Sequence, residues 1–240
     1  MDDTQGTRVT RRALRDYFPG SGPGRRLLPL PEQRCIYVRN AKAGTSTITL
    51  WLHRIHTGDH GFTPHASIHK EHALPRFQDV GWDQVVRMLN GEAFRFSFVR
   101  DPVRRAESAY VSKVLTERPG KPWRGYVQRA LGRPEDPAQV PTFEEFVAAL
   151  EVQEPIAMDA HWRPQHLNLM HGLVEYDYVG RLESFADDLA RVRELAGLPD
   201  VPIEVRNVSA KASDSLYDGR PDLLRKVREV YARDLELYGY

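Results

Sequence analysis

The chain has 240 residues, enough for one α/β domain with a substantial core or at most two small domains. Its formal net charge of +1 excludes a global field that would favour nucleic acid or an acidic membrane surface, so any basic site must be local. The single cysteine, Cys35, excludes an internal disulfide framework, and without a signal peptide or a run of roughly 18 apolar residues we expect a cytoplasmic protein with no membrane span.

Residues 1–33 are polar and rich in loop-forming residues. Thr10 to Phe18 can form a short helix, and a stretch rich in glycine, proline and arginine follows it. We therefore expect an N-terminal arm over residues 1–33, to which we assign no functional role, and one folded domain over residues 34–240.

An apolar run, a tight turn and an amphipathic helix follow one another after residue 34. Residues 35–38 predict a buried strand, and the helix has an apolar face at Ile48, Trp51, Leu52 and Ile55. The turn between them supplies a lysine, a glycine and three hydroxyl residues: Lys42, Gly44, Thr45, Ser46 and Thr47. Unpaired N–H groups and the positive end of the helix dipole make such a turn a cradle for phosphate or sulfate. Taken alone, the motif also fits a capped helix with a solvated lysine.

A histidine-dense segment follows this helix: His53, His56, His60, His65, His69 and His72. The spacing of the last three could hold zinc, but no cysteine accompanies them, and Pro64 and Pro75 limit regular structure. A histidine beside an anion cradle suits a general base, because its ordinary pKa lies near working pH. We therefore expect a base and no metal.

A second strand leads into a second helix near residue 100. Phenylalanines alternate through residues 94–98, and Asp101-Pro102 has the order of a helix cap followed by proline at the first helical position. The inner face of this helix is predicted at Val103, Ala106, Tyr110 and Val114. Arg100 ends the strand, where open α/β sheets bind ligands, although a surface ion pair with Asp101 is the alternative.

Residues 117–139 are basic, aromatic and rich in proline and glycine. Such a stretch is not typical of a core, so we expect a lid or an acceptor-contacting loop, with disorder as the alternative.

The remaining elements repeat the strand–helix order. Thr142 to Glu145 form a capping box, residues 174–179 predict a third strand, and the helix after it ends at Gly197. A final amphipathic helix is expected from Pro221 to about Tyr238. The polar and aromatic cluster at residues 159–165 fits neither helical nor strand periodicity. Helices between strands predict a single α/β domain with a central, mostly parallel sheet flanked by helices.

Two motifs together resemble the nucleotide-binding motifs of sulfotransferases that use 3′-phosphoadenosine 5′-phosphosulfate: residues 40–47, and residues 98–102 with 108–110. Within that family the chain is similar to the carbohydrate group that contains the heparan sulfate 2-O- and chondroitin 4-O-sulfotransferases. Further segments match in the same order: His65-Ala66-Ser67, His161-Trp162, residues 176–183, residues 211–213, and Tyr231 with Asp234 and Tyr238. The resemblance covers residues 34–240.

The resemblance implies a P-loop-like nucleotide-binding sulfotransferase fold, with adenosine 3′,5′-bisphosphate as the spent donor and no metal. It assigns the 5′-phosphosulfate to Lys42, Ala43, Gly44, Thr45, Ser46 and Thr47, and the 3′-phosphate to Arg100 and Ser108. It places Lys211 and Ser213 in a segment that closes over the donor. His65 matches the proposed catalytic base, with His69 and His72 as substitutes, and Lys42 would stabilise the leaving group.

The acceptor implied is a hydroxyl on a carbohydrate or a glycosylated small molecule, with no nucleic acid as partner. Aromatic side chains that could stack on sugar rings, or equally pack in the core, are Trp123, Tyr126, His161 and Trp162. Enzymes of this group are typically membrane-anchored Golgi proteins. Because this sequence shows neither an anchor nor disulfides, we expect a soluble, bacterial-type member that acts on a smaller glycan, a lipid or a metabolite. One rival function is a kinase or NTPase that uses the same loop. Its phosphate loop would have the order Gly-x4-Gly-Lys-Ser/Thr, whereas here Lys42 precedes Gly44. The other rival is a non-catalytic phosphonucleotide- or glycan-binding protein. The sequence leaves the oligomeric state open.

Overall fold

The computed structural model describes residues 8–18, 22–117, 120–203 and 215–240. The α/β domain divides into two compact units. The first, which we call the sheet unit, comprises Met1–Val99 and Leu167–Val208. The second, the helical unit, comprises Arg100–His166 and Ser209–Tyr240. None of the described helices combines the length and apolarity that crossing a membrane requires.

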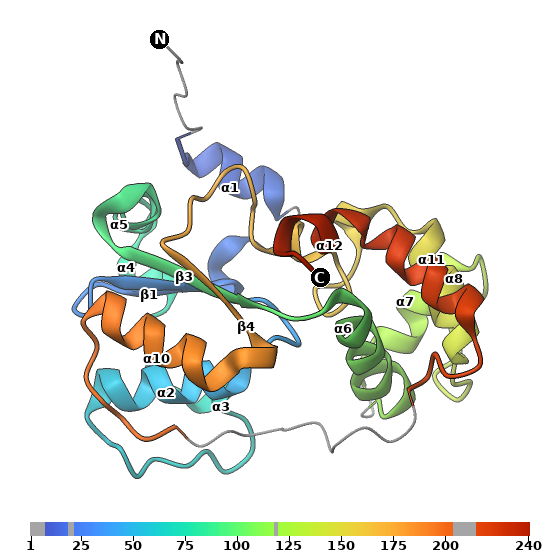
Figure 1. The fold of residues 1–240 in the computed structure, drawn as a ribbon, viewed down its shortest axis with the longest axis horizontal. Coiled ribbons are helices and arrows are strands. Elements are labelled where there is room, and N and C mark those ends of the chain that lie inside the picture. Colours follow the sequence, from blue (N-terminus) through green and yellow to red (C-terminus); the bar gives the residue numbers. More distant parts are fainter. Residues whose placement is uncertain (1–7, 19–21, 118–119, 204–214) are drawn as a thin grey trace. The chain divides into compact units, whose positions relative to one another are not determined.

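The sheet unit contains a four-stranded sheet in the order β1-β2-β3-β4 (Figure 1). Its strands are β1 (Leu27–Leu30), β2 (Cys35–Val38), β3 (Phe94–Val99) and β4 (Tyr178–Arg181). β2, β3 and β4 are parallel, whereas β1 is antiparallel to β2. The predicted α/β class and mostly parallel sheet are therefore confirmed, and the carboxyl ends of the parallel strands share one edge.

Two strand boundaries differ from the prediction. Leu27–Leu30 was expected in the N-terminal arm but is a fully buried strand, with Pro29 tolerated because β1 lies at the edge of the sheet. The third parallel strand begins at Tyr178 rather than Val174, because Val174 ends a turn in which its N–H donates to the Met170 carbonyl oxygen (3.0 Å). Both errors arise where tertiary contacts override the local pattern.

Helices α2 (Thr45–Thr57) and α10 (Phe185–Ala196) lie on the same side of the sheet, with α4 (Phe77–Val80) and α5 (Trp82–Arg87) on the other (Figure 1). The apolar face of α2 packs on the sheet as predicted, around stacked rings of Tyr37 and Phe96 whose centroids are 5.1 Å apart. Cys35 is fully buried in the same core. α10 ends at Gly197 in the left-handed conformation, which confirms the predicted helix end.

Shorter elements complete the sheet unit, and one of them, α9, includes residues assigned to each unit. They are α1 (Arg11–Tyr17), α3 (Ile68–Glu71), a π-helical turn (Met88–Glu92), α9 (Gln165–Asn168) and 3₁₀ turns at Pro23–Arg25 and Leu182–Ser184. α1 begins at the predicted position, where the Thr10 hydroxyl accepts from the Ala13 N–H (3.1 Å).

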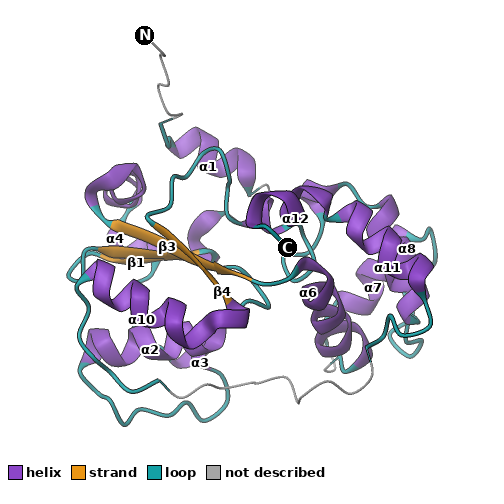
Figure 2. Ribbon diagram, in the orientation of Figure 1, coloured by secondary structure: helices purple, strands orange, loops and turns teal. Residues whose placement is uncertain are grey.

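The described part of the helical unit consists of helices and loops (Figure 2). Its elements are α6 (Pro102–Ala109), a π-helical turn (Tyr110–Leu115), α7 (Trp123–Ala130), α8 (Phe143–Val152), a 3₁₀ turn (Pro155–Ala157), α11 (Pro221–Val230) and α12 (Ala232–Tyr238). The Asp101 cap, the Thr142 capping box and the buried face of α6 are confirmed. The predicted final helix is instead divided at Tyr231, whose hydroxyl donates to the Trp162 carbonyl oxygen (2.5 Å) in the core.

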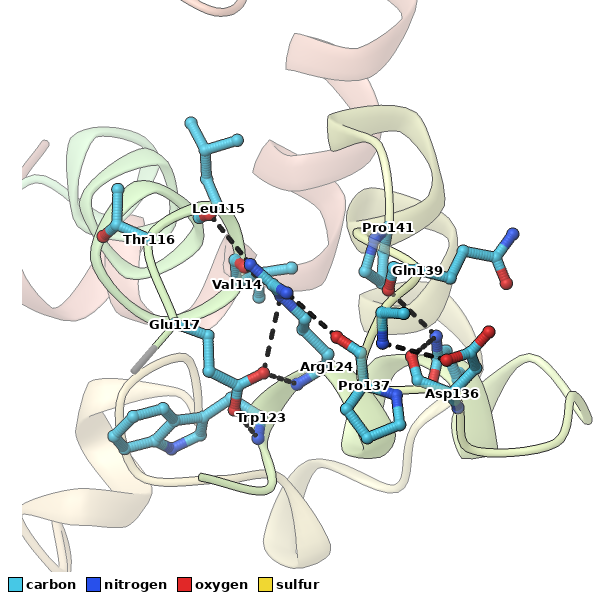
Figure 3. A network of polar contacts seen from close by, with 12 residues as sticks. Val114, Leu115, Thr116, Glu117, Trp123, Arg124, Asp136, Pro137, Gln139 and Pro141 are labelled. Atoms are coloured by element: carbon cyan, nitrogen blue, oxygen red, sulfur yellow. Dashed lines mark hydrogen bonds and ion pairs between the residues drawn. The ribbon is translucent and has the colours of Figure 1, made fainter. Parts of the chain in front are cut away.

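The described residues between 120 and 139 form helix α7 and ordered turns rather than a disordered loop, and their role as a lid or an acceptor-contacting segment stays a prediction. The Arg124 guanidinium donates to three backbone carbonyl oxygens, those of Val114 (2.9 Å), Leu115 (3.1 Å) and Pro137 (3.0 Å) (Figure 3). The Glu117 carboxylate accepts from the Trp123 N–H (2.6 Å), and Val127 is fully buried. The expectation that this segment stays out of the core is wrong for α7, where Val127 and Gln128 are buried, but residues 132–139 are exposed as expected. Arg124 orders the segment by linking α7 to the preceding turn and to Pro137.

A test of the sheet–helix packing is the substitution Gly180→Ala in β4. A Cβ atom there would lie 2.6 Å from the Phe98 ring and 3.0 Å from Asp188 Cβ, so we expect destabilisation by about 1–3 kcal/mol from overpacking. Urea unfolding measures this loss. Gly61→Ala is the control, since its Cβ would meet nothing closer than an Asp59 oxygen at 3.7 Å. Equal stability of the two variants would contradict the packing described.

Candidate functional site

The turn between β2 and α2, residues 40–47, has the backbone geometry of an anion-binding loop, and we call it the anion loop. Lys42 and Gly44 both adopt positive φ, 71° and 78°. A lysine in this region is uncommon and carries strain, which tends to be retained at functional sites. A Cβ on Gly44 would lie 2.9 Å from the Phe185 ring, so glycine is required there for packing as well as for φ. The predicted role of Gly44 in allowing close backbone approach to a ligand stays a prediction.

Buried polar contacts fix the anion loop to the carboxyl ends of two strands. The fully buried Asn40 side chain donates to the Phe98 carbonyl oxygen (3.0 Å), and the Asn40 carbonyl oxygen accepts from the Thr45 hydroxyl (2.7 Å). The Ser97 hydroxyl donates to the Val38 carbonyl oxygen (2.7 Å). The loop is therefore held in register with the end of β3 before any ligand binds.

The loop opens directly into the N-terminus of α2. Gly44 is the N-cap residue, and no side chain among the described residues caps this end of the helix. Lys42, Thr45 and Ser46 are partly exposed, whereas the Ala43 and Thr47 side chains are buried. The first-turn N–H groups and the helix dipole are thus placed as an anion site requires.

Two of the three candidate base histidines contact the anion loop or the residue before it. His69 Nε2 lies 3.0 Å from Ser46 Oγ, and His72 Nε2 lies 3.1 Å from an Arg39 guanidinium nitrogen. Burial, and then the Arg39 charge, lower the pKa of His72 to about 4. The structure therefore brings α3 against the loop, a proximity that sequence spacing did not predict.

The third histidine, His65, is exposed and is positioned through its backbone. The Glu71 carboxylate accepts from the N–H groups of His65 (2.7 Å), Ala66 (2.8 Å) and Ser67 (2.6 Å). These hydrogen bonds hold the pKa of Glu71 below its usual range, with the bond from Ser67 the largest cause. Glu71 thus fixes the turn that carries His65. Sequence analysis missed Glu71, because an exposed glutamate on a short helix carries no distinguishing pattern.

Arg100 and Ser108 are the site residues predicted in the helical unit, and both are partly exposed. The backbone of Arg100 exchanges two hydrogen bonds with the Gln165 side chain: its N–H donates to Oε1 (3.0 Å), and its carbonyl oxygen accepts from Nε2 (2.8 Å). The Asp101 carboxylate caps α6 by accepting from the Val103 N–H (2.8 Å). The start of α6 is therefore fixed immediately after β3.

The cluster at residues 159–165, which periodicity did not explain, supports Arg100. The fully buried Asp234 carboxylate accepts from the N–H groups of Gln165 (2.6 Å) and His166 (2.9 Å). The buried Arg105 guanidinium donates to the carbonyl oxygens of Arg163 (2.9 Å) and Ala160 (3.0 Å). Gln165 and Asp234 are thus supporting residues that sequence analysis did not place, because their roles depend on contacts between distant segments.

The four aromatic residues proposed for acceptor binding differ in exposure. Trp162 is fully buried and packs edge-on against Phe146 at 5.7 Å, so it is a core residue and its proposed acceptor role is wrong. Trp123, Tyr126 and His161 are partly exposed, and the His161 ring meets Trp123 edge-on at 5.5 Å. Acceptor binding by these three stays a prediction.

Two further sets of candidates concern the donor and a metal. Lys211 and Ser213 lie outside the described residues. The zinc alternative for His65, His69 and His72 finds no support in the described part of the chain, where no group of three or more potential ligands occurs, and His72 Nε2 faces a guanidinium instead.

A sequence profile described as "Sulfotransferase family" matches residues 26–240. The chain belongs to the sulfotransferase family. The matched range begins just before β1 and includes both units, so the family assignment covers the anion loop, Arg100 and the three candidate histidines.

Curated relatives of this sulfotransferase carry the name carbohydrate sulfotransferase. Carbohydrate sulfotransferase 12 of Xenopus laevis is 30% identical over 168 residues, covering 61% of this chain and 40% of its own length. Carbohydrate sulfotransferase 14 of Mus musculus is 34% identical over 158 residues, covering 61% and 42%. Carbohydrate sulfotransferase 10 of Gallus gallus is 24% identical over 193 residues, covering 72% and 53%. The chain therefore spans about half the length of these relatives or less, and no solved structure matches it.

The Glu71 contact predicts a pH-dependent ordering of the turn at His65. Because the pKa of Glu71 is lowered in the fold, the three hydrogen bonds are fully present above its ordinary pKa and are lost as pH falls through the lowered value. In Glu71→Gln, the N–H groups of His65, Ala66 and Ser67 should exchange with deuterium several-fold faster at neutral pH than in the wild type. Glu92→Gln, which removes an exposed pair with Arg87, is the control. Unchanged exchange in Glu71→Gln would contradict this role.

Proposed function

We propose that this chain transfers the sulfuryl group of 3′-phosphoadenosine 5′-phosphosulfate to a hydroxyl group of a carbohydrate or a glycosylated small molecule. The observation that carries the proposal is the anion loop, in which a strained Lys42 and a glycine at positive φ, Gly44, lead into the uncapped N-terminus of α2. Membership of the sulfotransferase family and the names of the curated relatives support sulfuryl transfer and a carbohydrate acceptor.

The donor would be held at both of its charged ends. Lys42 and the backbone N–H groups of residues 43–47 would bind the 5′-phosphosulfate, and Arg100 with Ser108 would bind the 3′-phosphate. Lys211 and Ser213 complete the proposed donor contacts. No residue in this set needs a metal, because lysine, arginine and helix N–H groups themselves neutralise the phosphate charge.

The proposed reaction is an in-line displacement at sulfur. A histidine takes the proton of the acceptor hydroxyl as its oxygen bonds to sulfur, and the bond from sulfur to the bridging oxygen of the 5′-phosphate breaks. Lys42 then stabilises the negative charge that develops on that oxygen. Positioning and charge stabilisation supply most of the rate, by analogy with phosphoryl transfer.

His65 is the base in this proposal. His72 is unsuited, because Arg39 occupies Nε2 and its pKa is lowered to about 4. His69 Nε2 already contacts the Ser46 hydroxyl, so we assign to His69 the role of orienting the Ser46 side chain. The His65 ring takes part in no hydrogen bond among the described residues, and Glu71 holds its backbone in place.

The assignment of the base is tested by comparing His65→Ala with His69→Ala. We expect His65→Ala to lower kcat roughly 100-fold or more, the usual scale for loss of a general base, with little change in donor KM. His69→Ala should mainly raise donor KM. The measurement is transfer of labelled sulfate from the donor to a panel of carbohydrate acceptors. If His65→Ala keeps wild-type turnover while His69→Ala loses it, the base is His69.

The role of Lys42 is tested with Lys42→Ala. This variant should lose both donor affinity and kcat, because the lysine binds the phosphosulfate in the ground state and the developing charge in the transition state. Thermal-shift titration with adenosine 3′,5′-bisphosphate measures the affinity, and ATP with magnesium tests the kinase alternative. Lys226→Ala, a surface lysine paired with Glu151, is the control. Unchanged kinetics in Lys42→Ala, or stabilisation by ATP with magnesium alone, would overturn the donor site.

A further inference from the structure

Arg39, the residue between β2 and the anion loop, carries a guanidinium without a carboxylate partner among the described residues. One of its terminal nitrogens donates to the Arg25 carbonyl oxygen (3.4 Å), and the other contacts His72 Nε2 (3.1 Å). Its Nε atom is buried and has no hydrogen-bond partner. Arg39 as a whole is partly buried, but buried polar atoms in proteins are normally hydrogen-bonded, so its unpartnered Nε leaves this arrangement incomplete.

His72 is the second half of the incomplete arrangement. A guanidinium can only donate, so His72 Nε2 must accept, which makes the ring neutral and places its proton on Nδ1. In the described structure Nδ1 is buried and has no partner. The pair therefore has one guanidinium and one imidazole in contact, with two buried nitrogen atoms left without hydrogen bonds.

The charged and titratable groups that face His72 come from three surrounding segments. They are Arg39 after β2, His53 on α2 and Arg76 at the start of α4, and each lowers the pKa of His72. The His53 ring is itself occupied, since its Nδ1 accepts from the Ala73 N–H (3.0 Å). The charges that act most strongly on His72 come from arginine and histidine side chains, so these surroundings favour an incoming anion.

We propose that Arg39 and His72 form an oxyanion-binding subsite beside the anion loop, which binds a phosphate or sulfate group and takes up one proton as it does so. The oxyanion inserts between the two side chains and accepts from both, with the new proton on His72 Nε2. That proton comes from solvent, and no other bond forms or breaks. This subsite adds to the proposed function. It depends on that function in one respect, that the neighbouring anion loop binds an oxyanion.

Binding is measured calorimetrically in two buffers of different ionisation enthalpy, which gives the number of protons taken up. Inorganic sulfate is the first probe, because it does not itself titrate near neutral pH. An oxyanion bound there would raise the pKa of His72 from its value of about 4, so sulfate affinity should fall as pH rises from just above 4 through the raised value. We expect uptake of up to one proton near pH 6 in the wild type, and its loss in His72→Gln but not in His60→Gln, a substitution of an exposed histidine outside the proposed site.

Arg39→Gln should weaken sulfate binding by roughly 10- to 100-fold, the range for loss of one charge-assisted hydrogen bond. Arg39→Lys, which keeps the charge, should recover part of the affinity and guards against a folding defect in Arg39→Gln. The matched control is Arg87→Gln, an exposed arginine of the same unit that pairs with Glu92. The proposal is overturned if Arg39→Gln binds sulfate like Arg87→Gln, or if His72→Gln takes up as many protons as the wild type.

A second probe separates the two sources of the oxyanion. If the nucleotide supplies it, Arg39→Gln weakens binding of adenosine 3′,5′-bisphosphate, and sulfate no longer binds at the subsite of the nucleotide-saturated protein. If the acceptor supplies it, nucleotide affinity is unchanged and sulfate still binds the saturated protein with proton uptake; both results support the subsite. If the wild-type protein binds neither sulfate nor the nucleotide, the donor site and the subsite are both overturned. If the wild type binds them and the Arg39 and His72 variants bind them equally well with the same proton uptake, only the subsite is overturned.

Discussion

The site depends on a backbone conformation that the chain would not adopt without support. Lys42 lies in the left-handed region, where a residue with a Cβ costs of order 1–3 kcal/mol. Asn40 makes two hydrogen bonds, a buried one to Phe98 and a partly buried one from Thr45. Each contributes about 0.5–1.5 kcal/mol, and together they are of the size needed to offset this cost. Because Asn40 bonds to the end of β3, the sheet itself determines the shape of the anion loop.

The same device recurs in the helical unit. Asp234 is a fully buried carboxylate that fixes the backbone at Gln165, and Gln165 in turn fixes the backbone at Arg100. In both units a buried polar side chain orders the chain just after a parallel strand, where ligands bind in open α/β sheets. Neither Asn40 nor Asp234 needs to touch a ligand to determine where ligand-binding groups lie.

What the sequence predicts well is local. The strands at residues 35–38 and 94–99, the caps at Asp101 and Thr142, and the buried faces of α2 and α6 each follow from periodicity or from residues adjacent in the chain. The motifs within those elements also placed the anion loop at a strand–helix turn. These features could be predicted because each is determined by a few neighbouring residues.

The features that were missed depend on distant contacts. The strand at Leu27–Leu30 exists because it pairs with β2, and its buried face gives no alternation to recognise. The structure of residues 120–139 rests on Arg124, whose carbonyl partners lie up to 13 positions away. The contact of His69 with Ser46 spans 23 positions, so spacing within the histidine segment could not reveal it. Composition was most misleading for residues 120–139, where a single side chain, Arg124, donates hydrogen bonds to three backbone carbonyl groups.

The buried cysteine has a practical consequence for studying this protein in solution. Cys35 is the only cysteine in the chain, and burial raises the pKa of its thiol to about 12, so almost none of it is thiolate at neutral pH. Maleimide reagents, which require an accessible thiolate, should therefore leave the folded wild type unmodified. A cysteine introduced at an exposed position would be the single reactive thiol, and one fluorophore could be attached there without first removing Cys35 from the core.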